Sequence, residues 1–122
     1  METASRDLGR TRVPTALFYG THDQIIEDEP MALALERAGE PPNLRTAFYE
    51  DGWHLLNRDR QALRVYGDVA AFLRDPAAPF PSGAPPVPAN SQRLETVMLA
   101  RQEQAAYLAR TKICSGKAQF RA

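Results

Sequence analysis

Two short segments that are typical of strands, each followed by a polar turn, limit the folds that this chain of 122 residues can adopt. The first run covers residues 13–19 and ends at Gly20, and the second covers residues 44–49. The first is almost continuously apolar, which is typical of a strand buried on both faces of a parallel sheet. Both runs are therefore predicted to be strands.

A helix is predicted after each strand. Asp28 and Glu29 supply charge at the start of the first helix, Pro30 suits its first position, and Gly39 suits the residue after its end. The second helix is predicted after a cap at Asn57 or Asp59. Its apolar positions repeat every three or four residues and are predicted to face the core, with Phe72 widening that face: Leu63, Tyr66, Val69, Ala70 and Leu73.

The order strand, helix, strand, helix predicts an α/β fold with two parallel strands, because the crossover between them is right-handed. Two parallel strands and two helices leave sheet edges and faces uncovered. A segment of about 60 residues also buries only about 60% of its extended surface. The chain is therefore predicted to hold the last βαβα units of a larger sheet.

Composition divides the chain into segments. Residues 1–12 form a polar amino-terminal segment, and residues 13–74 form the compact part. Six of the ten prolines fall in residues 75–91, which predicts an extended linker. Residues 92–111 are predicted to form an amphipathic helix, followed by a flexible tail over residues 112–122. The helix could dock on the body, mediate self-association or remain weakly ordered.

Several classes of function are disfavoured by composition. The formal net charge is zero, so no nucleic-acid partner is expected. The single Cys114 excludes an internal disulfide and a cysteine-based metal site within one chain. No apolar run is long enough for stable membrane insertion, and the amino terminus lacks the apolar stretch of a secretory signal. A cytoplasmic location is expected, with no metal or organic cofactor.

Two ionisable residues follow the predicted strands. Asp23 lies in the turn after the first strand, and His54 lies in the turn after the second. Neighbouring parallel strands bring their following loops together, so a carboxylate can meet an imidazole there. The carboxylate would fix the tautomer and leave the other nitrogen free as a general base. The alternative is that Asp23 only caps its turn and His54 is an ordinary loop residue.

The amino-acid sequences of these segments resemble those of α/β-hydrolases. Residues 13–26, with the sequence VPTALFYGTHDQII, resemble the acid-bearing strand and loop of that fold. Residues 49–59, YEDGWHLLNRD, resemble the histidine loop of the monoacylglycerol lipase and lysophospholipase-like branch, and residues 65–73 are similar to its closing helix. The resemblance covers residues 13–74. It implies that Asp23 is the acid and His54 the general base of a serine-hydrolase triad.

The resemblance also implies a nucleophilic serine in a G-x-S-x-G turn, and this chain has none. Losing such a nucleophile costs roughly a million-fold in turnover, so the chain alone is predicted to be inactive. A lipid-like carboxylic ester is expected as substrate only where the missing part is present. The alternative is a catalytically inactive remnant that self-associates or binds a partner.

Other residues carry weaker hypotheses. His22 with Glu27 and Asp28 lacks the spacing of a recognised metal site, so a plain loop histidine is favoured. Trp53 is expected to pack beside the site rather than to bind substrate. Cys114 is disfavoured as a nucleophile, because only nearby lysines would lower its pKa.

Overall fold

The fold is a small α/β unit, seen in a computed structural model that describes residues 2–88, 103–104 and 106–110. Helices and strands alternate through the body. In chain order they are α1 (Glu2–Asp7), the 3-10 helix η1 (Leu8–Arg10), β1 (Thr15–Gly20), α2 (Asp28–Ala38), β2 (Leu44–Tyr49), the 3-10 helix η2 (Leu56–Arg58) and α3 (Ala62–Arg74). The predicted order of strands and helices is confirmed.

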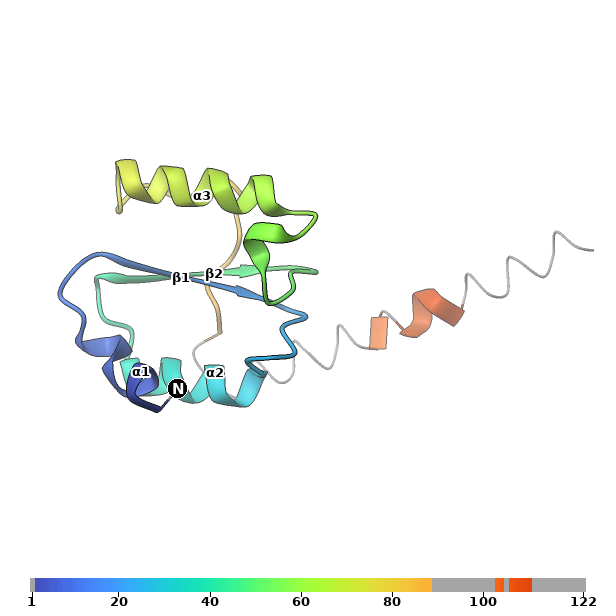
Figure 1. The fold of residues 1–122 in the computed structure, drawn as a ribbon, viewed down its shortest axis with the longest axis horizontal. Helices are drawn as coiled ribbons and strands as arrows, with labels where there is room; N and C mark the ends of the chain where they lie inside the picture. The colour runs from blue at the N-terminus through green and yellow to red at the C-terminus, as the bar shows by residue number, and fades with distance from the viewer. Residues whose placement is uncertain (1, 89–102, 105, 111–122) are drawn as a thin grey trace, which may run out of the picture.

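The sheet consists of β1 and β2, which pair in parallel with a register running from Thr15 opposite Leu44 to Gly20 opposite Tyr49. The helix α2 covers one face of this sheet and α3 covers the other (Figure 1). The predicted α/β class with two parallel strands is therefore confirmed.

Local sequence signals account for α2. Its first turn carries Asp28 and Glu29, and Gly39 after its end has a φ of 68°, a left-handed conformation that glycine adopts without strain. The amide of Gly39 donates to the carbonyl of Leu35 at 3.2 Å, which closes the last turn. The helix begins two residues before Pro30, so this proline is not at the first helical position as predicted. Met31, Ala32 and Leu35 are buried against Tyr19 and Phe48.

The buried face of α3 differs from the predicted one. Val65 and Asp68 are buried and Phe72 is partly buried, whereas Leu63 and Leu73 are 84% and 77% exposed. The observed face is the predicted set shifted by one residue, a rotation of about 100°. The cause is Asp68, whose carboxylate is turned inward and accepts hydrogen bonds from the Tyr49 hydroxyl at 2.6 Å and the Ser82 amide at 2.8 Å. Apolar periodicity alone could not reveal an inward carboxylate.

The proline-rich segment 75–88 packs on the body instead of forming the predicted linker. Phe80 and Val87 are buried in the two cores that lie on opposite faces of the sheet. The amide of Phe48 donates to the carbonyl of Pro85 at 2.7 Å, and the amide of Val87 donates to Thr46 Oγ1 at 2.9 Å. The segment therefore runs along the outer edge of β2, from the α3 face to the α2 face (Figure 1).

Both ends of the chain contain helical segments. The polar amino-terminal segment forms α1 and η1, and Arg37 donates to Ser5 Oγ at 3.3 Å across to α2. Residues 103–104 and 106–110 are helical, within the helix predicted over residues 92–111. The rest of that helix, residues 89–91 of the predicted linker and the tail over 112–122 lie outside the described residues. In the described part of the chain, no helix has the length and apolar character needed to cross a bilayer.

Candidate functional site

The two loops that follow β1 and β2 are joined to each other by backbone hydrogen bonds. The amide of Thr21 donates to the carbonyl of Tyr49 at 3.0 Å, and the amide of His22 donates to the carbonyl of Gly52 at 2.8 Å. The amide of Asp51 donates to Thr21 Oγ1 at 2.8 Å. Because the parallel strands end at the same edge of the sheet, this pairing continues beyond the sheet and holds the two loops side by side.

The two loops can pair this closely because Gly20 and Gly52, which have no side chain, lie where they meet. A Cβ atom at Gly20 would lie 2.3 Å from the carbonyl oxygen of Gly52, and one at Gly52 would lie 2.6 Å from Leu56 Cδ2. The first contact is with backbone, which cannot rotate away. Glycine at position 20 is therefore required for the two loops to meet.

Replacing Gly20 by alanine is expected to lower the free energy of unfolding by about 1–3 kcal/mol, because the methyl group forces the loops apart. Gly67→Ala is the matched control, since a Cβ at Gly67 has no heavy atom within 4 Å and alanine favours the helix. Urea unfolding of both variants measures the difference. Equal stability of the two variants would contradict the close approach.

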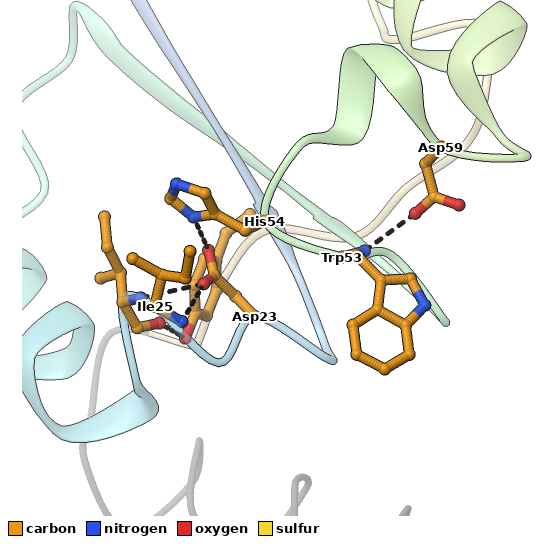
Figure 2. Close-up of polar contacts among 7 residues, drawn as sticks. Asp23, Ile25, Trp53, His54 and Asp59 are labelled. Atoms are coloured by element: carbon orange, nitrogen blue, oxygen red, sulfur yellow. Dashed lines mark hydrogen bonds and ion pairs between the residues drawn. The ribbon is translucent and has the colours of Figure 1, made fainter.

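Asp23 and His54 form a hydrogen-bonded pair where the loops meet. His54 Nδ1 lies 2.9 Å from Asp23 Oδ2, and the side chains are 34% and 6% exposed (Figure 2). Among the described residues, His54 Nε2 has no hydrogen-bond partner, and it points away from Asp23 (Figure 2). The aspartate is thus buried behind the imidazole, while the outer nitrogen stays accessible.

The carboxylate of Asp23 also caps its own turn. Its Oδ1 accepts the amides of Ile25 and Ile26, both at 2.9 Å, so the turn-capping alternative and the pairing with His54 hold together. Burial raises the pKa of this carboxyl, but the hydrogen bonds from the Ile26 amide, the His54 ring and the Ile25 amide outweigh it. The net result is a pKa of Asp23 below its usual value, so the group is ionised at neutral pH.

Acid is expected to remove a stabilising contribution of Asp23. Its pKa is lower in the folded state than in the unfolded state, where an aspartate titrates at about 3.9. The contribution is therefore complete above that unfolded value and is lost as the pH falls through the folded pKa. Urea midpoints of wild type and Asp23→Asn should converge below about pH 4. A constant difference between them down to the lowest pH would contradict this prediction.

The His54 loop is fixed from both sides by residues that the sequence did not single out for this role. The amide of Trp53 donates to Asp59 Oδ2 at 2.9 Å, as Figure 2 shows. On the other side His22 Nε2 lies 3.1 Å from Asp51 Oδ1, and the rings of His22 and Trp53 are 5.3 Å apart. Asp59 thus holds the loop and does not cap α3, whose cap residue is Gln61. The predicted packing role of Trp53 agrees with its contact to His22.

A nucleophile for this pair is not found among the described residues. Ser5 accepts a hydrogen bond from Arg37, and the hydroxyl of Ser82 donates to Asp68. Ser91, Ser115 and Cys114 lie outside the described residues. In the same described part, no group of three or more His, Cys, Asp or Glu could hold a metal ion. What remains is a His–Asp pair suited to proton transfer.

Comparison with known proteins gives no match: no family model, no curated protein and no solved structure corresponds to this chain.

Proposed function

We propose that Asp23 and His54 are the acid and the general base of a serine hydrolase that cleaves carboxylic esters. The observation that carries this proposal is the 2.9 Å contact between His54 Nδ1 and Asp23 Oδ2 at the carboxyl edge of a parallel strand pair. Reactive groups gather at this edge in open α/β sheets. Their order along the chain, aspartate before histidine, also agrees with that of α/β-hydrolases.

The pair would act through proton transfer at His54. With Nδ1–H held by the ionised Asp23, Nε2 is the basic nitrogen and is free to accept the proton of a serine hydroxyl. Attack of that serine on the ester carbon produces a tetrahedral intermediate, and the imidazolium then gives its proton to the departing alkoxide. Asp23 stabilises the imidazolium while it exists. Water deacylates the enzyme by the same two steps.

Apolar side chains next to the pair support an ester with an apolar portion, of the acylglycerol or lysophospholipid type. Ile25 and Leu55 lie within two residues of Asp23 or His54 in the sequence and are 71% and 56% exposed. Exposed apolar side chains in the two loops that carry the pair are consistent with a substrate that has an apolar portion. No serine of the 122 residues stands in a G-x-S-x-G turn, so the proposal requires a serine from a further part of the hydrolase, and we expect the 122-residue chain to be inactive by itself.

The test begins with the DNA upstream of Met1, read in frame for a G-x-S-x-G turn. The longer frame is expressed and treated with a fluorophosphonate probe, which labels activated serines. We expect labelling of the longer protein, loss of labelling in its His54→Ala variant, and no labelling of the 122-residue chain. Labelling of the short chain, or labelling of the longer protein that is unaffected by His54→Ala, would overturn the proposal.

A second candidate, an inactive module that associates with another polypeptide, is favoured by one specific observation. The outward side of α3 carries exposed apolar residues beside an edge of β1 that has no partner strand among residues 2–88, 103–104 and 106–110. The surface that these features form is described next.

A further inference from the structure

The edge of β1 that faces away from β2 has no neighbour in the part of the chain that the structure describes. The amides of Thr15 and Thr21 both donate to the β2 side, so the odd-numbered residues of β1 face β2. The backbone groups of Ala16 and Phe18 therefore point outward, since direction alternates along a strand. This edge can accept a further strand.

The two edges of the sheet differ in how far the described part of the chain covers them. Segment 75–88 covers the outer edge of β2, where Phe48 donates to Pro85, and the side chains of Ala47, Phe48 and Tyr49 are fully or almost fully buried. Along β1 the side chains from Thr15 to Phe18 are only partly buried, although most are apolar. An apolar strand with an open edge is a site of association.

A stripe of exposed apolar residues on α3 lies on the side of this open edge. Arg64 and Asp68, on one flank of α3, contact Ser82 of the segment that covers the β2 edge. The other flank of α3 therefore faces the β1 side. Four apolar side chains that are 37% to 84% exposed lie on that flank and on the adjoining outward side of α3, and are here called the α3 stripe: Leu63, Tyr66, Val69 and Leu73.

The net charge of the chain and the symmetry of a possible dimer favour a second copy of the chain as the partner that covers this surface. The α3 stripe contains no charged residue, and the net charge of the chain is zero, so two copies do not repel each other. A twofold axis perpendicular to the sheet would pair two β1 edges in antiparallel fashion and place both α3 helices on the same face. The two stripes would then meet, as an isologous interface requires.

We propose that the 122-residue chain forms a dimer in which β1 pairs with β1 of a second copy and the α3 stripes pack together. The result is a four-stranded sheet with the order β2–β1–β1–β2. In a longer polypeptide that supplies its own strand at this edge, that strand would displace the second copy. The dimer is therefore a property of the 122-residue chain and is independent of catalysis at the carboxyl edge.

Sedimentation of the full chain over a range of micromolar concentrations tests the proposal. We expect a species of twice the chain mass of 13.6 kDa, and we expect Leu73→Glu to weaken dimerisation at least about tenfold, since each dimer carries two copies of the change. The control is Ala77→Glu, an exposed position of the segment at the opposite, β2 edge of the sheet, which should leave the dimer intact. Circular dichroism verifies that both variants are folded.

Hydrogen exchange of the wild-type chain gives a second readout that needs no variant. The amides of Ala16 and Phe18 should exchange more slowly at high chain concentration than at low concentration, because they donate to the second copy only in the dimer. A monomer at all concentrations would overturn the proposal. So would a dimer in which these amides exchange freely, or a monomer in which they are protected, which would assign the edge to the chain's own carboxyl-terminal part.

Discussion

Replacing His54 by alanine is expected to lower kcat of the serine-containing hydrolase by about 10⁶-fold, the loss found when a triad histidine is removed. The structure explains why no neighbour can substitute. The second histidine, His22, contacts Asp51 at 3.1 Å through Nε2, and the Asp51 side chain is 74% exposed, whereas that of Asp23 is 6% exposed. His54 is the imidazole that Asp23 holds through Nδ1, with its outer nitrogen accessible. Turnover of a short-chain p-nitrophenyl ester by the longer protein measures the effect.

Variants of the neighbouring residues separate a catalytic role from a structural one. Asp23→Asn keeps the shape of the side chain but should lower kcat by about 10⁴-fold, because an amide can hold the imidazole in the wrong tautomer. His22→Ala, which removes a contact to Asp51 behind the loop, should cause a much smaller loss. A His54→Ala enzyme that is no slower than His22→Ala would show that the Asp23–His54 contact is only structural.

The site was more predictable from the sequence than the packing around it. Asp23 and His54 each follow a predicted strand that ends in a polar turn, so strand order and parallel pairing allowed them to meet, and the resemblance to α/β-hydrolases favoured that prediction over simple turn capping. Gly39 ends α2 as predicted, because a left-handed residue after a helix has a local signal. These features depend on short stretches of chain, which a single sequence records directly.

Features that depend on long-range partners were not predictable. The inward turn of Asp68 requires Tyr49 and Ser82, which lie 19 and 14 residues away in the sequence. The same contacts hold segment 75–88 on the body, although its prolines predicted a linker. The role of Asp59 at the Trp53 amide was also missed, because an aspartate before a helix normally indicates a cap. In each case a carboxylate accepts a hydrogen bond from a donor that apolar periodicity and local cap signals do not reveal.

Replacing Asp68 by alanine is expected to lower the free energy of unfolding by about 2–4 kcal/mol, because two buried donors lose their acceptor. Asp68 is fully buried, and its removal leaves the Tyr49 hydroxyl and the Ser82 amide without their acceptor. The loss is a large part of the roughly 5–15 kcal/mol that stabilises a typical domain. Urea unfolding provides the measurement. Asp7→Ala, which removes an exposed carboxylate 3.4 Å from Arg10, should change stability by no more than about 0.5 kcal/mol.

A double-mutant cycle with Tyr49→Phe tests whether the hydrogen bond at 2.6 Å is what fixes the rotation of α3. If it is, the effects of Asp68→Ala and Tyr49→Phe are not additive, and the coupling is about 0.5–3 kcal/mol. A loss below about 1 kcal/mol for Asp68→Ala would mean that α3 rotates and repacks instead of leaving the two donors unpaired. With no carboxylate to keep inward, α3 could turn by one residue and bury the stripe of Leu63, Tyr66, Val69 and Leu73 against its own sheet. That rotation would also remove the stripe from the dimer interface, so a small loss of stability should be accompanied by weaker dimerisation.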